Sequence, residues 1–87
     1  MKIEKITIDK FEDEDVDGVV KKKVGLKVLN DEGGEFITDT YLDIVDGKTV
    51  DDYTKDAYDA KKSNIDKWIS SLVNIGKTFN PSTGKIE

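Results

Sequence analysis

The chain of 87 residues contains no cysteine, no histidine and no arginine, and only one proline. Without cysteine there is no disulfide, no thiolate nucleophile and no zinc site with sulfur ligands. The lack of histidine removes the commonest general base, and the lack of arginine removes the bidentate clamp for phosphate groups. Catalysis would depend on Asp, Glu, Lys, Tyr, Ser and Thr alone. We therefore expect a protein that is not an enzyme and that carries no organic cofactor.

Long apolar runs are missing as well. No stretch approaches the roughly 20 apolar residues of a transmembrane helix, and the first residues alternate Lys, Ile and Glu instead of forming a signal peptide. Together with the absence of cysteine, this predicts a cytoplasmic site of action. The chain is 36% hydrophobic and 38% charged, but its apolar residues fall in periodic blocks, which favours a folded domain over disorder. The length suits a single domain over residues 1–87.

Alternating apolar and polar residues predict three strands. They cover about residues 2–11, 19–29 and 35–45. In the second strand, Val24, Leu26 and Val28 share one face. The third strand carries apolar residues on both faces, which is typical of a central strand or of one whose outer face is partly covered. Residues 12–18 form an acidic break before the second strand, and the glycine pair at 33–34 is suited to a hairpin turn.

The longest periodic segment, at about residues 50–75, predicts an amphipathic helix. Thr49 and Asp52 have the form of a capping pair. Either one long helix runs through this segment or two helices meet near Ser63, which is a poor residue for a helix interior. Beyond Gly76 the tail forms a short hairpin or hooks Phe79 onto the core. The expected fold is α+β, with a three-stranded, mostly antiparallel sheet packed against the C-terminal helix or helix pair.

One acidic segment resembles half of a calcium-binding loop. Asp13, Asp15, Asp17 and Gly18 occupy positions one, three, five and six of such a loop, where alternate carboxylates converge on a hard cation. Position twelve is Val24, where the loop needs a bidentate glutamate. A calcium site is thus a weaker hypothesis than a solvated acidic turn.

The charge distribution gives the main candidate for function. Residues 31–59 carry ten acids and two lysines, a net charge of −8. If the third strand and the helix present their acids together, the row of carboxylates suits the basic groove of a nucleic-acid-binding protein. Ordinary ion pairs four residues apart on the helix are the alternative interpretation. The predicted partner-binding residues are Asp39, Tyr41, Asp43, Asp52, Tyr53, Asp56 and Asp59.

The aromatic and basic residues also allow more than one interpretation. Tyr53 and Tyr58 are five residues apart on the helix, so one of them is expected at the margin of the core, where a tyrosine suits a contact surface. Trp68 is expected in the core. The three lysines at residues 21–23 are interpreted as edge-strand charges that discourage aggregation, and nucleic acid is not expected as a direct partner.

The segment Ile75-Gly76-Lys77-Thr78-Phe79-Asn80-Pro81-Ser82-Thr83-Gly84, which follows a helix containing tryptophan, resembles the ends of small acidic proteins encoded by bacteriophages. The resemblance covers about a quarter of the chain. It implies a viral or mobile-element origin. Small acidic proteins of that origin are often inhibitors of a host enzyme or a CRISPR effector, and others are minor parts of virions.

These observations predict a small acidic binding protein, a monomer or small homo-oligomer, that inhibits a host protein with a basic surface and does not bind a membrane. A structural subunit of a virion or another assembly is the alternative. A calcium-stabilised binding module is a third and weaker one.

Overall fold

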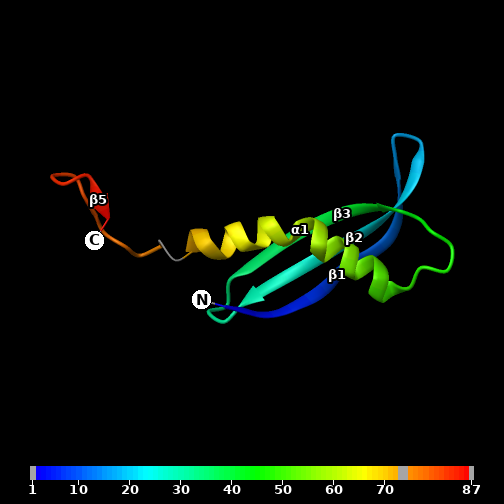
Figure 1. The fold of residues 1–87 in the computed structure, drawn as a ribbon, viewed down its shortest axis with the longest axis horizontal. Helices are drawn as coiled ribbons and strands as arrows, with labels where there is room; N and C mark the ends of the chain where they lie inside the picture. Colours follow the sequence, from blue (N-terminus) through cyan, green and yellow to red (C-terminus); the bar gives the residue numbers. More distant parts are fainter. Residues whose placement is uncertain (1, 73–74, 87) are drawn as a thin grey trace.

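The computed structural model describes residues 2–72 and 75–86 and has an α+β fold. A three-stranded antiparallel sheet, in the order β1-β2-β3, packs against a single helix, and a short β hairpin follows it (Figure 1). The predicted fold class is therefore confirmed. The elements are β1 (Ile3–Val16), β2 (Val19–Asn30), β3 (Glu35–Asp43), α1 (Val50–Leu72), β4 (Phe79–Asn80) and β5 (Lys85–Ile86).

The first two strands form a hairpin that is longer than predicted. The acidic break is absent, because β1 continues to Val16 and only Asp17 and Gly18 turn the chain. Both turn residues have positive φ, 54° and 85°, as in the type I′ turn that joins twisted antiparallel strands. The acids at residues 12–14 lie directly opposite the lysines at residues 21–23. Cross-strand pairs of opposite charge stabilise a sheet, so the acidic residues extend the strand instead of breaking it.

β2 is the central strand, and β1 and β3 both have a free edge. The third strand is thus not central. The interpretation of the lysines at residues 21–23 as edge-strand charges is also wrong, because they lie on β2. Val24, Leu26 and Val28 share the covered face of β2 and are fully buried, as the alternation predicts.

α1 begins at the predicted capping pair. The Asp52 N–H donates to Thr49 Oγ1 (3.1 Å), and the Thr49 N–H donates to Asp52 Oδ2 (3.5 Å). The helix continues through Ser63 and Asn64, which are exposed, to the fully buried Ile65. One long helix is therefore correct, because the two polar residues face solvent and the next residue anchors the helix to the sheet.

α1 is described as far as Leu72, and residues 73–74, which the predicted end near residue 75 includes, lie outside the described part of the chain. Ile75 and Gly76 form a turn, and Gly76 has φ 88°. Within the described residues, no helix combines the length and apolarity needed to cross a membrane.

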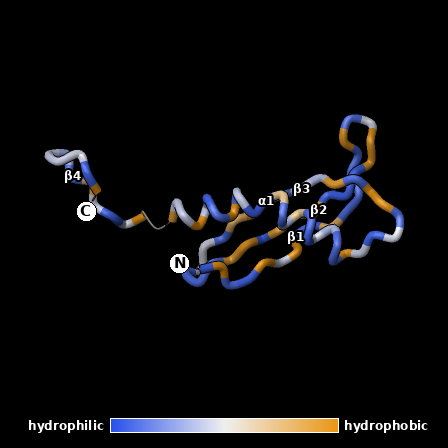
Figure 2. Tube along the Cα trace, viewed as in Figure 1, coloured by the Kyte–Doolittle hydropathy of each residue, from blue (hydrophilic) through white to orange (hydrophobic). Residues whose placement is uncertain are grey.

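The core lies between α1 and the two strands β2 and β3. Tyr53 and Ala57 of α1 pack against Val24 and Leu26 of β2. Further along the helix, the half-buried Trp68 stacks on Phe36 of β3, with ring centroids 5.4 Å apart and planes at 23°. Figure 2 shows that apolar residues also occur away from this core, at the tip of the β1–β2 hairpin and between β3 and α1. The core is thus thin, and Trp68 lies at its margin.

The tail forms the hairpin that was one of the two predicted alternatives. Asn80 organises it, since its Oδ1 accepts a hydrogen bond from the Ser82 N–H (2.9 Å) and its carbonyl oxygen accepts one from the Gly84 N–H (2.9 Å). Figure 1 shows the hairpin standing away from the sheet. Phe79 remains 60% exposed and does not hook onto the core.

Candidate functional site

The predicted acidic surface is divided in two by the sheet. Asp39, Tyr41 and Asp43 lie opposite Gly25, Lys23 and Lys21 of β2, on the open face, which we define as the face of the sheet away from α1. α1, which carries the other predicted acids, packs against the opposite side of the sheet. The prediction that strand and helix acids form one surface is therefore wrong. The alternate residues of β3, including Phe36, Thr40 and Leu42, turn toward α1, so the acids must face the other way.

Lysines accompany the acids of the open face. Lys21 forms an ion pair with Asp43, Lys27 Nζ lies 3.3 Å from Glu35 Oε1, and Lys10 Nζ of β1 lies 3.7 Å from Asp39 Oδ2. The Lys21 ammonium holds the pKa of Asp43 below its usual value through a hydrogen bond and charge attraction. These pairs leave the open face a mixed surface, which does not act as a row of unpaired carboxylates.

Tyr41 is exposed on the open face, as a contact residue requires. A hydrogen bond to the Glu14 carboxylate raises the pKa of the Tyr41 hydroxyl, and the same bond lowers the pKa of Glu14. Lys23 completes the group, with its Nζ 3.6 Å from Glu14 Oε1 and 5.7 Å from the centre of the Tyr41 ring. Tyr41 remains a candidate, but as part of a charged cluster with Glu14 and Lys23.

Tyr53 is not a surface residue. It is 4% exposed and packs edge-on against Phe11, with ring centroids 6.0 Å apart. Its hydroxyl accepts a hydrogen bond from the Val45 N–H (2.8 Å) and donates to the Val45 carbonyl oxygen (3.2 Å). Tyr58 is the tyrosine at the margin of the core, as the spacing of the two residues requires. The prediction of Tyr53 as a contact residue is thus wrong, because the apolar stripe of α1 passes through it.

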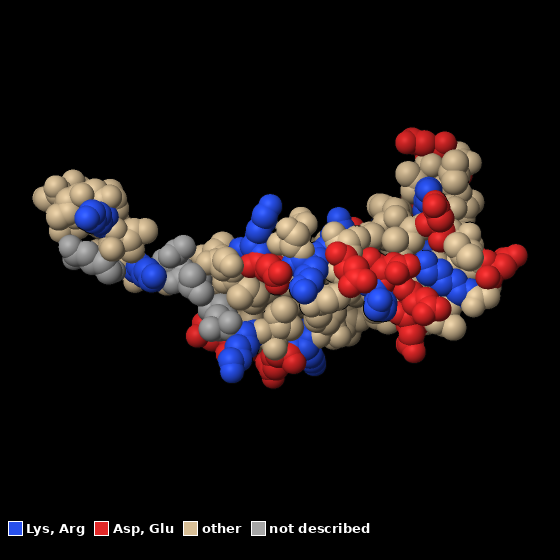
Figure 3. All heavy atoms as spheres, in the orientation of Figure 1, with Lys and Arg blue, Asp and Glu red and all other residues tan. Residues whose placement is uncertain are grey.

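The acids of α1 do gather on an exposed surface. Residues 50–59 carry four acids and only one lysine. Figure 3 shows acidic side chains clustered over the first half of α1, with a few lysines between them. Lys48 pairs with Asp56, and Lys55 Nζ lies 3.7 Å from Asp59 Oδ2 on the solvent side. We define the acidic helix surface as Asp51, Asp52, Asp56 and Asp59.

The candidate calcium ligands do not converge. Asp13 pairs with Lys22, and Asp15 Oδ1 accepts the Gly18 N–H (2.8 Å) within the hairpin turn. Asp17 is a turn residue with positive φ. In the described ranges 2–72 and 75–86, no group of three or more acidic side chains is placed to hold a metal ion. An extended hairpin spreads alternate carboxylates along the strand, whereas a calcium loop folds them around the cation.

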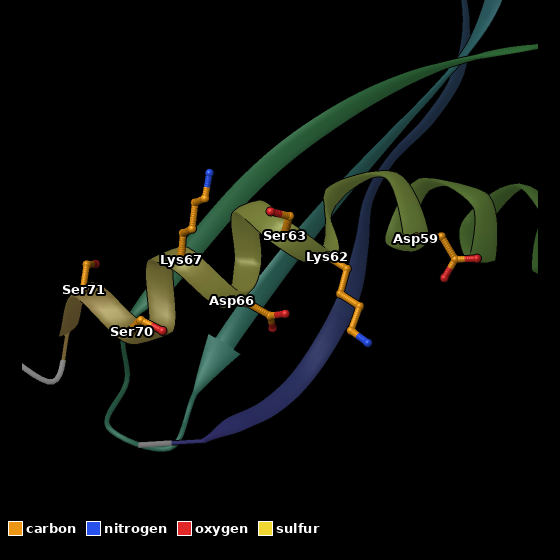
Figure 4. Close-up of a pocket in the computed structure, with 7 residues that line it drawn as sticks. All are labelled: Asp59, Lys62, Ser63, Asp66, Lys67, Ser70 and Ser71. Carbon is orange, nitrogen blue, oxygen red and sulfur yellow. The ribbon is translucent and has the colours of Figure 1, made fainter.

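Shallow depressions on the described surface include two beside α1. One, of about 820 Å³, lies along the outer side of the second half of α1. Figure 4 shows Lys62 and Asp66 on one side of this stretch and Lys67 on the other. The second, of about 640 Å³, lies beside the β2–β3 turn and Trp68. A depression lined by a single convex helix does not enclose a substrate.

Comparison with family models, curated proteins and solved structures found no match to this chain.

β1 carries a surface that the alternation of its residues did not indicate. Ile6 and Ile8 face the same side of the sheet as the helix, because they pair with Val28 and Leu26, but they remain 38% and 42% exposed. A helix is about 10 Å wide and strands lie about 4.8 Å apart, so one helix covers two strands better than three. That comparison of widths is the signal that could have identified the uncovered strand.

Proposed function

We propose that this protein is a non-enzymatic binding protein that docks its acidic helix surface onto a basic surface of another protein. By occupying that surface, it prevents the other protein from binding its own ligand. The site of action is the cytoplasm. The observation that carries the proposal is the net negative charge on the exposed side of the first turns of α1. Four carboxylates lie there, and Lys48 and Lys55, which pair with Asp56 and Asp59, balance only two of them. Such a surface speeds association with a basic partner through long-range attraction.

The carboxylates stand on a well-anchored part of the fold. Tyr53 and Ala57, on the opposite side of the same helix turns, are buried against β2. The capping pair of Thr49 and Asp52 fixes the start of the helix. Because the helix is held in place before binding, little conformational entropy is lost on docking.

The partner class follows from the spacing of the charges. Asp52, Asp56 and Asp59 are four and three residues apart, so they form a row with about 5–6 Å between neighbours. In a nucleic-acid-binding groove, basic side chains bind the phosphates of the backbone. Such a groove accepts a row of carboxylates in place of those phosphates. The likeness of the tail to phage-encoded proteins supports a host nucleic-acid-binding protein, such as a CRISPR effector, as the partner.

Two variants with the same change in net charge test this proposal. Asp52 is kept in both because it caps the helix. The first variant neutralises the acidic helix surface with Asp51→Asn, Asp56→Asn and Asp59→Asn. The matched control neutralises three exposed acids elsewhere with Asp17→Asn, Glu32→Gln and Asp66→Asn.

Both variants and the wild-type chain are immobilised and exposed to a bacterial lysate at low salt, and retained proteins are identified by mass spectrometry. We expect the wild type and the matched control to retain a common basic protein that elutes with added salt. The first variant should retain at least tenfold less of it. Equal retention by all three chains, or retention that salt does not weaken, refutes the proposal.

A structural subunit of a virion or another assembly is the second candidate function. The observation that favours it is the tail hairpin, which presents Phe79 and Ile86 to solvent on an extension apart from the sheet. Phe79→Ser leaves the core untouched. If this second function is correct, the substitution abolishes incorporation of the chain into particles in a sedimentation assay, whereas wild-type levels of incorporation refute it.

A further inference from the structure

β1 is an edge strand with an uncovered apolar side. α1 packs on β2 and β3, so the side of β1 next to the helix is left half-exposed. Ile3, Ile6 and Ile8 lie there, and Phe11 follows them in the same row, since they pair with the buried side of β2. Beside this row, the outer edge of β1 presents backbone groups that no strand of the sheet pairs with.

Two β-bulges place the charged residues between Ile3 and Phe11 on the open face. The register shifts at Glu4 and again at Asp9, so each of these residues shares one β2 partner with the lysine that follows it. Lys5 lies opposite Leu29, and Lys10 lies opposite Gly25. The result is a strand that is symmetric about Thr7 in two respects. Apolar residues occur at equal distances on both sides of it, and so do the two bulges.

We propose that β1 pairs antiparallel with β1 of a second copy of this chain, about a two-fold axis at Thr7. In this register each residue lies opposite the one at the same distance from Thr7 in the other copy. Ile6 faces Ile8, and Ile3 faces Phe11, all on the helix side. Opposite charges also meet on the open face. These are the pairs Lys5–Asp9 and Glu4–Lys10, and each pair occurs twice by symmetry.

The charges select this register. A shift of one copy by two residues in one direction places Ile6 opposite Lys10 and Glu4 opposite Glu12. A shift by two residues in the other direction places Ile8 opposite Glu4. Because of the bulges, such a shift also places apolar residues opposite residues of the open face. Charges on an edge strand normally discourage pairing with unrelated strands. Here they disfavour those strands and favour one partner, a second copy of the same chain.

Pairing of this kind makes one continuous six-stranded sheet. A two-fold axis perpendicular to the sheet keeps the helix sides of both copies together, so both α1 helices lie on the same face. The isoleucines of the two β1 strands then pack against each other between the helices. The acidic helix surface takes no part in this contact. A negative result for the dimer therefore leaves the proposed function untouched, and the reverse also holds.

Charge exchange tests the contact in the full chain by light scattering and sedimentation. We expect the wild type to be a dimer. Lys5→Asp and Asp9→Lys each replace two attractive pairs by two repulsive ones, so each should weaken the dimer about tenfold or more. The double variant restores opposite charges and should dimerise again. The two single variants, when mixed, should form a heterodimer. Circular dichroism confirms that each variant is folded.

A cysteine substitution locates the axis. The natural chain has no cysteine, so any cross-link comes from the new residue. Thr7→Cys brings two sulfurs together at the axis, where facing Cα atoms are about 4.5–5.5 Å apart, and should give a disulfide-linked dimer under mild oxidation. Glu35→Cys, on the opposite edge of the sheet, is the control and should not cross-link. A monomeric wild type, a dimer that the single variants do not weaken, or cross-linking only through residue 35 would each overturn the proposal.

Discussion

The substitution Thr40→Val should stabilise the protein. Thr40 is 8% exposed, on the covered face of β3 opposite the fully buried Val24. Its hydroxyl oxygen is buried, and no hydrogen-bond partner for it lies among the residues that the structure describes. A buried hydroxyl without a partner costs about 1–3 kcal/mol of desolvation. Valine has nearly the same shape and suits a strand equally well, so it removes this cost without leaving a cavity.

We expect the free energy of unfolding to rise by about 1 kcal/mol, the lower end of that range. For a domain of this size the melting temperature should rise by about 4–8 °C. The measurement is urea and thermal unfolding followed by circular dichroism. Thr38→Val, two residues away on the same face but less buried, is the control and should change stability by less than about 0.5 kcal/mol. A destabilised Thr40→Val variant would show that the hydroxyl is satisfied and that the reasoning is wrong.

Three further predictions concern single residues. Asn30→Ala should lower the free energy of unfolding by about 2–3 kcal/mol in urea unfolding, because the buried Oδ1 accepts two backbone N–H groups of the β2–β3 turn (2.9 and 2.8 Å). Gly25→Ala should cost about 1–3 kcal/mol in the same assay, because the added Cβ would lie 3.0 Å from Lys10 Cβ and 3.2 Å from the Lys10 backbone nitrogen, as well as 2.7 Å from Asp39 Oδ1. Glu14→Gln should bring the pKa of Tyr41 down toward the ordinary 10.0, as followed by NMR of the tyrosine ring. In the wild type, the lowered pKa of Glu14 means that its contribution to stability is present above pH 4.5 and is lost as the pH falls through the lowered value.

The fold class and the local features of each element could be predicted from the sequence. The buried face of β2 follows from alternation of Val24, Leu26 and Val28, and the helix start follows from the side chains of Thr49 and Asp52. These features depend on residues close together in the chain. The hairpin turn at Asp17 and Gly18 is equally local. The acids before it nevertheless resemble a break in the strand, because the lysines that neutralise them lie on the neighbouring strand.

The division of the candidate surface could not be predicted in the same way. Whether Asp39 and Asp56 share a surface depends on which side of the sheet the helix covers, and this is decided by packing between distant segments. The strand order has the same origin. The burial of Tyr53 depends on Phe11, forty-two residues earlier, and on the Val45 carbonyl oxygen, which accepts a hydrogen bond from the Tyr53 hydroxyl. A periodic pattern predicts which face of a helix is apolar, but it does not predict which residues pack against that face.

The far end of the β1–β2 hairpin has a consequence for the dynamics of the molecule. Beyond Phe11, the hairpin extends away from the helix, and ion pairs such as Asp13–Lys22, in which the Asp13 side chain is exposed, hold the two strands together in place of a core. Exposed ion pairs each contribute little and are screened by salt. The backbone amides at the tip should therefore exchange with solvent long before those of Leu26, and the difference should widen as ionic strength increases. The tip can thus open and close while the rest of the sheet stays folded.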